Sequence, residues 1–273
     1  NNSYVDVHDN TQFTNGENIC LADKFSDITN NQEWYNLGYG LINTKKILDL
    51  KEIKNSLQKL IYKMIHEYNK DISKDEFTLE KYHRFVDKNL HMEIIKKTRN
   101  LEALDFGFEE HNLLKYVSNI IGIRLNWKSS GTYNPKIIVR INTPQSSNFN
   151  PAHKDVYQVY DETGNIPKMV NLWIPICGVK KKTGLPLALG SHLIYENRVL
   201  RTKAGVSMAG DNYNVNCIKS WDKKNYLKTI IPKEDQMIIF SSFLIHGLAK
   251  NYNEDETRIS LEFRLFGDEN GNI

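Results

Sequence analysis

The chain has little cysteine. Of its 273 residues only Cys20, Cys177 and Cys217 are cysteines. Their number is odd and no two have C-x-x-C spacing, which argues against a disulfide framework and against a zinc knuckle. A reducing cytoplasm is the simplest setting for such a chain, so we expect a cytoplasmic protein.

Long apolar runs and strong net charge are also absent. No stretch approaches the roughly 18 consecutive apolar residues of a membrane span, and no secretory pattern opens the chain. The formal net charge is +3, and lysines are spread along the chain, so nothing indicates a membrane or nucleic-acid partner. Hydrophobic residues make up 40% and charged residues 25%, enough for a sizeable core.

The first half is predicted to be an irregular arm followed by a helical layer. Residues 1–35 are rich in Asn, Asp and Thr, which is typical of irregular structure, and Leu37–Asn43 is predicted to be a short strand. From Leu50 to Tyr68 apolar residues recur at steps of three and four, which predicts an amphipathic helix. Further helices are expected over about Lys74–Leu101 and Glu109–Ile121.

After Gly131 the pattern becomes strand-like. Short β-rich segments separated by Gly, Pro, Asn and Asp are Lys136–Thr143, Val156–Tyr160, Met169–Cys177, Leu185–Leu189, Lys228–Ile231, Gln236–Ser241 and Ile259–Phe266. The fold class is therefore expected to be mainly β with a helical layer: a double-stranded β-helix, or cupin-like jelly-roll barrel, buttressed by the N-terminal helices. No linker divides the chain, so we predict a single domain over 1–273. In it, 1–130 is the arm and helical layer and 131–273 is the barrel with a metal site.

A histidine and an aspartate stand two residues apart within Asn150–Tyr160. On a strand His153 and Asp155 would face the same side, although such a pair alone also occurs in surface loops. An imidazole and a carboxylate are two-thirds of the 2-His-1-carboxylate set that holds Fe(II). The expected third ligand is His246, which lies 246 − 153 = 93 residues further on. His192 is a weaker candidate because it lies in a turn.

An arginine follows the last of these histidines. Arg258 comes 258 − 246 = 12 residues after His246 and opens a predicted strand. A guanidinium presents a fixed fork that matches a carboxylate with two hydrogen bonds. An iron oxygenase that uses 2-oxoglutarate needs such a group for the far carboxylate of that cosubstrate. The order His-x-Asp, His, Arg therefore predicts this class of enzyme.

These residues, with Thr183–His192 and the Arg258-x-Ser260 pair, resemble the phytanoyl-CoA dioxygenase-like branch of the Fe(II)/2-oxoglutarate oxygenases. The segment Gly38–Ile53 is similar to the opening strand and helix of that family, so the likeness runs from about Gly38 to Phe266. The resemblance implies an enzyme that needs Fe(II), 2-oxoglutarate and O2. By default it would hydroxylate a C–H bond of a small metabolite, anionic or neutral, while 2-oxoglutarate is decarboxylated to succinate. Desaturation, ring closure and epimerisation start from the same hydrogen abstraction and stay open.

The resemblance also implies contacts with the cosubstrate. Trp173 falls where the family places a tryptophan beside 2-oxoglutarate, although it could equally be a core residue. Ser260 has the strand parity of Arg258 and could add a hydroxyl donor to the same carboxylate. Asn142 and Thr183 are further cosubstrate candidates.

Four residues are candidates for contact with the substrate. Tyr157 has the strand parity of His153, so it should face the pocket as a substrate contact or as part of its wall. Arg140 lies on the first barrel strand, and His192 could touch the substrate or shape its loop. Arg201 could attract an anionic substrate to the pocket mouth, or it could lie in a solvated loop.

Two other classes of function stay open. A cupin-like metal-binding protein without oxygenase activity would be expected to lack a ligand or the arginine, and here all four are present. A metal-dependent lyase or isomerase would use the ion as a Lewis acid without oxygen. The substrate identity and the oligomeric state are not encoded in any pattern that we can read.

Overall fold

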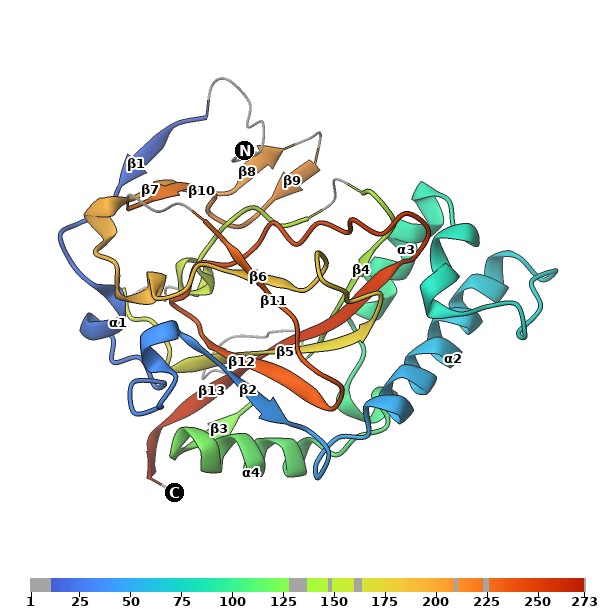
Figure 1. Cartoon of the computed structure of the whole chain (residues 1–273), viewed down its shortest axis with the longest axis horizontal. Coiled ribbons are helices and arrows are strands. Elements are labelled where there is room, and N and C mark those ends of the chain that lie inside the picture. Colours follow the sequence, from blue (N-terminus) through green and yellow to red (C-terminus); the bar gives the residue numbers. More distant parts are fainter. Residues whose placement is uncertain are drawn as a thin grey trace.

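The largest element of the structure is a six-stranded antiparallel sheet (Figure 1). A computed structural model describes residues 11–127, 137–146, 149–159, 164–208, 211–222 and 226–272. The strands run in the order β2 (Tyr39–Asn43), β12 (Gln236–Ser241), β5 (Met169–Cys177), β13 (Arg258–Asn272) and β3 (Ile123–Asn126). A further strand, β4 (Ile138–Asn142), pairs with the first five residues of β13. Strands from both halves of the chain therefore build one sheet.

Alternation along β13 gives this sheet two different faces. Ile259, Leu261 and Leu265 are buried in the main hydrophobic core. Glu262 and Arg264, between them in sequence, line a cavity on the opposite face. Because successive side chains of a strand point to opposite sides, one strand serves both the core and the cavity.

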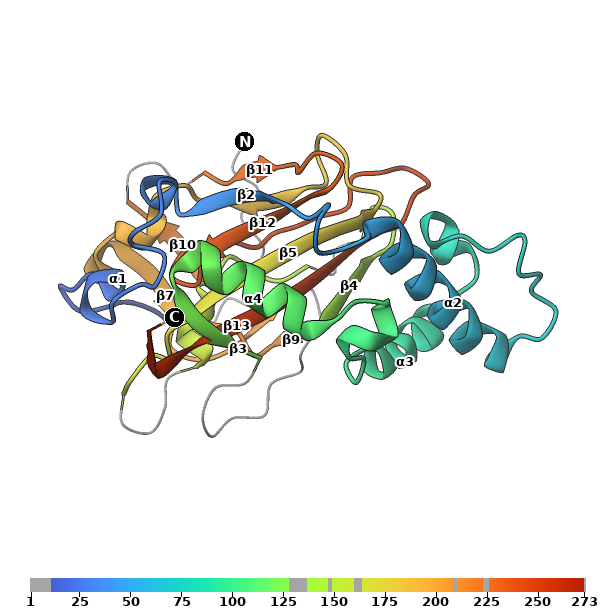
Figure 2. The same cartoon turned by 90° about the horizontal axis from the view of Figure 1, so that it is seen from below.

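Helices cover the core face of the sheet. They are α2 (Leu50–Tyr68), α3 (Lys88–Thr98) and α4 (Glu110–Ile121). Figure 2 shows α4 lying across the sheet, with α2 and α3 beside it. Asp49 caps α2 by accepting hydrogen bonds from two backbone N–H groups of its first turn, and the buried residues of α2 recur at steps of four.

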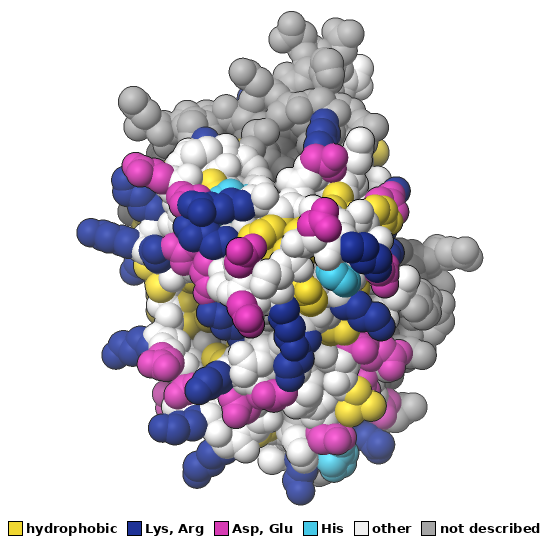
Figure 3. Space-filling model, turned by 90° about the vertical axis from the view of Figure 1, so that its right-hand side faces the viewer, with side chains coloured by type: hydrophobic (Ala, Val, Ile, Leu, Met, Phe, Trp, Pro, Cys, Tyr) yellow, Lys and Arg dark blue, Asp and Glu magenta, His cyan; other side chains and the backbone are white. Residues whose placement is uncertain are grey.

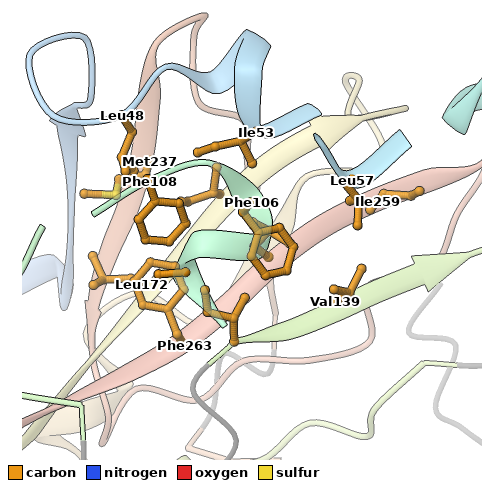
Figure 4. Packing of buried hydrophobic residues seen from close by; sticks show 14 of the residues in the cluster. Leu48, Ile53, Leu57, Phe106, Phe108, Val139, Leu172, Met237, Ile259 and Phe263 are labelled. Carbon is orange, nitrogen blue, oxygen red and sulfur yellow. The ribbon is translucent and has the colours of Figure 1, made fainter. Parts of the chain in front are cut away.

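The helices and the sheet share one apolar core (Figure 4). Ile53 and Leu57 of α2 lie close to Phe106, and Leu172 and Phe263 come from the sheet. A side chain of this size that is fully removed from water contributes about 1.5–3 kcal/mol to stability. This core therefore fixes the sheet whose other face carries the cavity.

A second layer lies over the cavity face. In it β6 (Leu185–Leu187) pairs with β11 (Lys228–Ile230), and His246 makes isolated bridges with Leu187 and with His153. A smaller apolar cluster joins the two layers, with Trp173, Ile238 and Phe240 from the large sheet and Leu185, Leu187, Ile230 and Leu244 from the second layer. The chain is thus mainly β, with two facing layers and helices outside one of them.

The remaining strands lie at the edge of this arrangement. A three-stranded sheet has the order β1 (Phe13–Asn15), β7 (Val199–Thr202) and β10 (Ile218–Trp221), and β8 (Val206–Met208) pairs with β9 (Asp211–Tyr213). No helix of the described part of the chain is long and apolar enough to cross a membrane. Figure 3 shows a face on which acidic and basic side chains are interspersed.

Most elements expected from periodicity are confirmed. The strand after Leu37, the helices at Leu50–Tyr68 and Glu110–Ile121, and the strands Met169–Cys177 and Gln236–Ser241 agree with the expectation to within two residues. The expected arm is not wholly irregular, because β1 and the short helix α1 (Leu21–Lys24) form in it. Its first ten residues, like Gly131, Lys136 and Tyr160, lie outside the described residues.

Two expectations are wrong. The helix expected over Lys74–Leu101 is divided into a 3-10 helix, Leu79–Arg84, and α3. The division follows from Asp87, whose carboxylate accepts from the N–H of Leu90 and begins a new helix. The strand expected at Val156–Tyr160 is a 3-10 helix over Asp155–Gln158. The antiparallel bridge between His153 and His246 is isolated, so the backbone pairing ends at His153 and no strand continues beyond it.

Candidate metal centre

His153, Asp155 and His246 converge. All three are buried, and one potential ligand atom from each lies within 4.8 Å of the other two. Nε2 of His153 is 3.5 Å from Oδ1 of Asp155, and Nε2 of His246 is 3.7 Å from Oδ2 of Asp155. Two imidazoles and one carboxylate at this spacing are a donor set that fits a divalent transition metal.

The two histidines face one another across an antiparallel bridge. Each backbone N–H donates to the other backbone carbonyl, at 2.9 and 3.0 Å, and the ring centroids are 4.3 Å apart. Nδ1 of His153 lies 2.7 Å from the carbonyl of Pro151, and Nδ1 of His246 lies 3.0 Å from that of Leu244. A carbonyl only accepts, so each Nδ1 carries the proton and each Nε2 keeps a lone pair for a metal.

The protonation of the site suits metal binding as well. Burial, reinforced by the neighbouring His153, lowers the pKa of His246 to about 4, so this ring is neutral at neutral pH. Burial alone would raise the pKa of Asp155. The positive charge of Arg264, with the two histidines, outweighs it and holds the pKa of Asp155 well below its usual value. The centre thus offers a neutral imidazole at His246 and an ionised carboxylate at Asp155.

Two residues that the sequence analysis missed hold this carboxylate. Nη2 of Arg264 donates to Oδ1 of Asp155 at 2.6 Å, and Nδ2 of Asn171 donates to Oδ2 at 2.7 Å. Both could have been found by strand alternation, because Arg264 shares the parity of Arg258 on β13 and Asn171 that of Trp173 on β5. They orient the carboxylate from both of its oxygens.

The cavity beside the three residues is lined by charged groups of the large sheet. Arg140, Glu262 and Arg264 face it, together with Trp173 and Phe240. Nε of Arg140 donates to Oε2 of Glu262 at 2.8 Å. Burial would raise the pKa of Glu262, but Arg140 outweighs burial, and the pKa lies below its usual value. Glu262 is thus an ionised group that the sequence analysis also missed.

Arg258 is buried at one end of the same sheet face. Its Nε donates to the carbonyl of Thr183 at 2.6 Å, Nη1 to Oδ1 of Asn142 at 2.8 Å, and Nη2 to the carbonyl of Gly184 at 3.3 Å. The guanidinium carbon lies 5.4 Å from the centre of the Trp173 ring. Burial lowers the pKa of Arg258 to about 10, which leaves it charged at neutral pH.

Thr183 and Asn142 hold the guanidinium. The Thr183 hydroxyl is used within its own turn, where it donates to the carbonyl of Gly178 and accepts from the N–H of Lys180. The backbone carbonyl of Thr183 is the group that accepts the hydrogen bond from Arg258. The structure therefore places both residues beside the arginine as acceptors.

Two buried donors beside Arg258 have no hydrogen-bond partner among the described residues. They are Nε1 of Trp173 and the hydroxyl of Ser260. Ser260 is two residues from Arg258 on the same strand face, and the Trp173 ring lies near the guanidinium. A buried donor without an acceptor costs about 1–3 kcal/mol. An arginine with two unused donors beside it fits a ligand that carries a carboxylate.

Among the predicted cosubstrate and substrate residues, Trp173 and Arg140 line this cavity. The residues outside its lining are Arg258, Ser260, Asn142, Thr183, Tyr157, His192 and Arg201. Tyr157 donates from its hydroxyl to Glu196 at 2.6 Å, and the Arg201 guanidinium carbon lies 4.2 Å from the centre of its ring. The expected orientation of Tyr157 toward the cavity depended on a strand, and the 3-10 helix removes that alternation. His192 is fully buried and packs edge-on against Tyr35. Of the four predicted substrate contacts, Arg140 lines the cavity.

Comparison with known proteins gives a fold and no family. No protein-family model and no curated protein matches the chain. The crystal structure of AviO1 from Streptomyces viridochromogenes Tue57 matches with a TM-score of 0.50 and 13% identity, covering 87% of this chain and 93% of that one. EctD from S. alaskensis, crystallised with 2-oxoglutarate and 5-hydroxyectoine, matches at 0.48 and 10%, covering 96% and 86%. The epimerase SnoN, in complex with Fe3+, alpha ketoglutarate and nogalamycin RO, matches at 0.46 and 11%, covering 87% and 82%.

At these identities the likeness concerns the fold alone. The AviO1 match spans most of both chains and agrees with the mainly β architecture, a curved antiparallel sheet with helices on one face. What the chain can do chemically follows from its own residues, above all from the convergence of His153, Asp155 and His246.

Proposed function

We propose that the chain is an Fe(II)- and 2-oxoglutarate-dependent oxygenase of the phytanoyl-CoA dioxygenase-like family, with a double-stranded β-helix fold. The observation that carries the proposal is the convergence of His153, Asp155 and His246 within 4.8 Å. The two facing layers support a jelly roll, because the segments with the ligands bridge one another opposite the large sheet. We expect a single domain that acts in the cytoplasm on a small molecule.

The metal ligands would be Nε2 of both histidines and the carboxylate of Asp155. This three-residue set leaves other coordination positions open for ligands that are not part of the protein. Bound iron, with 2-oxoglutarate and O2, would supply the oxidation of a C–H bond, with decarboxylation of 2-oxoglutarate to succinate. The chain itself orients the imidazoles through their Nδ1 hydrogen bonds and the carboxylate through Arg264 and Asn171.

Arg258 would anchor the far carboxylate of 2-oxoglutarate. Its remaining hydrogen-bonding capacity, the Ser260 hydroxyl and Nε1 of Trp173 supply donors that the described residues leave unused. Asn142 and Thr183 would fix the guanidinium before the cosubstrate arrives. Such a rigid anchor lowers the entropy lost on binding.

The remaining residues that line the cavity would bind the substrate and determine its specificity. Arg140 and Arg264 carry positive charge there, and Glu262 offsets part of it. The mixed signs favour a substrate with one anionic group or a polar neutral one over a highly charged substrate. Hydroxylation is the expected outcome.

Release of succinate tests the proposal. Purified protein, supplied anaerobically with Fe(II) and 2-oxoglutarate and then exposed to air, is expected to form succinate even without substrate, through slow uncoupled turnover. Omission of either component, or a chelator, should abolish it. Tight binding of a metal at the three ligands with no binding of 2-oxoglutarate would contradict the proposal.

A metal-dependent isomerase or lyase is the second candidate, and Glu262 is the observation that favours it. An ionised carboxylate that lines a metal cavity can act as a general base. In such an enzyme the metal would polarise a carbonyl, and Glu262 would remove a proton from the neighbouring carbon. Activity that persists without 2-oxoglutarate and without oxygen would separate this candidate from the oxygenase.

A further inference from the structure

A fully buried ion pair involves the residue between two of the candidate metal ligands. Lys154, between His153 and Asp155 in sequence, has no exposed surface, and its Nζ lies 2.7 Å from Oε1 of Glu196. Glu196 is also buried and accepts the Tyr157 hydroxyl at 2.6 Å through Oε2. Arg201 completes the group, with Nε 3.5 Å from the same oxygen.

Glu196 is itself held in place by the N-terminal segment. Its backbone N–H donates to the carbonyl of Ile19 at 2.8 Å, and its carbonyl accepts from the N–H of Gly16 at 3.0 Å. A Cβ at Gly16 would lie 2.6 Å from Cβ of Glu196, so the close approach requires glycine. The carboxylate that meets Lys154 is therefore anchored at the backbone.

The same part of the chain also holds the other ligand segment. The hydroxyl of Ser191, five residues before Glu196, accepts from the N–H of Ile245 at 2.8 Å, and Ile245 precedes His246. Ser191 thus binds the residue that precedes His246. Glu196 binds Lys154, which lies between His153 and Asp155. The segment 188–196 therefore contacts the backbone or side chain of a residue adjacent to each ligand.

We infer that Glu196 positions His153 and Asp155 for metal binding through its buried ion pair with Lys154, and so sets metal affinity. The inference rests on the metal centre of the proposed function. A buried ion pair adds little net stability over apolar groups of the same size, because removing two charges from water costs about what their attraction returns. A role in orientation explains why this costly pair lies beside the ligands, because groups that orient ligands change metal affinity by about 10–100-fold.

The test separates affinity from folding. Lys154→Met, Glu196→Gln and the double variant are compared with wild type by thermal unfolding of the metal-free protein and by Co(II) titration followed by visible absorption. Lys154→Met leaves buried Glu196 with Arg201, 3.5 Å away, as its remaining cation, and Glu196→Gln leaves buried Lys154 without its counter-charge. The Tm of each single variant should therefore fall by roughly 5–15 °C. The double variant removes both buried charges, and glutamine still accepts from Tyr157. Arg201 is partly exposed and loses only its 3.5 Å contact, so the Tm should return close to wild type.

Metal affinity should not return with stability. In the double variant we expect Co(II) to bind about 10–100-fold more weakly, with altered absorption bands. The matched control is Lys54→Met/Glu80→Gln, which removes a lysine–glutamate pair of the helical layer and should leave Co(II) affinity unchanged. Recovery of both Tm and affinity in the double variant would overturn the positioning role.

Two further results keep the test decisive. If the double variant does not fold, Tyr157→Phe removes one hydroxyl from Glu196 and keeps the ring. A loss of Co(II) affinity of about threefold or more supports the inference, and a lower Tm with unchanged affinity overturns it. Absence of Co(II) binding by wild type would overturn the metal centre and this inference with it. Wild-type binding with unchanged affinity in the double variant overturns the inference alone.

Discussion

The guanidinium of Arg264 donates to a carboxylate oxygen of Asp155 at 2.6 Å, so a candidate metal ligand is held by a cation of the large sheet. This cation keeps the pKa of Asp155 low although the group is buried. Without it, protons compete better with the metal. In Arg264→Met, the pH below which Co(II) binding is lost should rise by roughly one unit or more.

Co(II) titrations between pH 5 and 8 measure this shift. Arg140→Met is the matched control, because its guanidinium pairs with Glu262 in the same cavity. The control should keep the wild-type midpoint. An equal shift in both variants would mean that general charge in the cavity, and not the contact with Asp155, sets the protonation of the ligand.

Arg258 should act on 2-oxoglutarate and leave the metal alone. Arg258→Met removes the charged fork, and charge-assisted hydrogen bonds contribute about 1.5–3 kcal/mol each. We expect 2-oxoglutarate to bind about 100-fold more weakly, with Co(II) affinity within about twofold of wild type. Anaerobic calorimetry of the metal-loaded protein measures both. Equal affinity for 2-oxoglutarate in wild type and variant would refute the anchor.

The two buried donors beside Arg258 give a separate test of where the cosubstrate binds. Trp173→Phe removes Nε1 and keeps most of the ring, and Ser260→Ala removes one hydroxyl. Neither donor has a partner among the described residues, so neither variant loses a hydrogen bond, and Ser260→Ala should keep the Tm within a few degrees of wild type. Trp173→Phe also loses packing of a fully buried indole, so its Tm should fall further. Each should weaken 2-oxoglutarate binding by roughly 3–10-fold, the equivalent of about 1 kcal/mol. Unaltered binding in both would place the cosubstrate elsewhere.

His192 should make the metal-free protein sensitive to acid. Burial lowers the pKa of His192 to about 4, whereas an unfolded histidine has a pKa near 6.5. Between these values the unfolded chain binds more protons, so stability is full above about pH 6.5 and falls as the pH drops toward 4. At pH 5 the loss due to His192 is about 2 kcal/mol.

Urea unfolding at pH 7.5 and pH 5 measures this loss. Buried His246 contributes a similar loss, for the same reason. In His192→Phe the contribution of one ring is absent, so the decrease in the free energy of unfolding should be about 2 kcal/mol smaller than in wild type. Equal decreases would show that His192 is protonated as easily in the folded chain as in the unfolded one.

Local periodicity was sufficient for elements that bury one face. The helix Leu50–Tyr68 and the strands Met169–Cys177 and Gln236–Ser241 follow from apolar spacing, because each buries a single stripe or alternates through a sheet. The order of His153, Asp155, His246 and Arg258 can also be recognised in the sequence. It depends on residue types and not on their exact backbone conformation.

The failures arise where distant contacts decide the local structure. The chain after Asp155 turns into a 3-10 helix, and Tyr157 binds Glu196, 39 residues away, which no local pattern reveals. Alternation places Arg264 and Asn171 on the site face of their strands, but their contacts with Asp155 join distant parts of the chain, which no local pattern reveals. A buried Lys154 is likewise invisible in sequence, where a lysine reads as exposed.

Iron binding by wild type and Asp155→Ala tests the central claim most directly. Under anaerobic conditions, with circular dichroism to confirm that both proteins are folded, Fe(II) should bind wild type at one ion per chain. Asp155→Ala should bind none at the same iron concentration, since one of three ligands is lost. Equal iron binding by the two proteins would contradict a centre built from His153, Asp155 and His246.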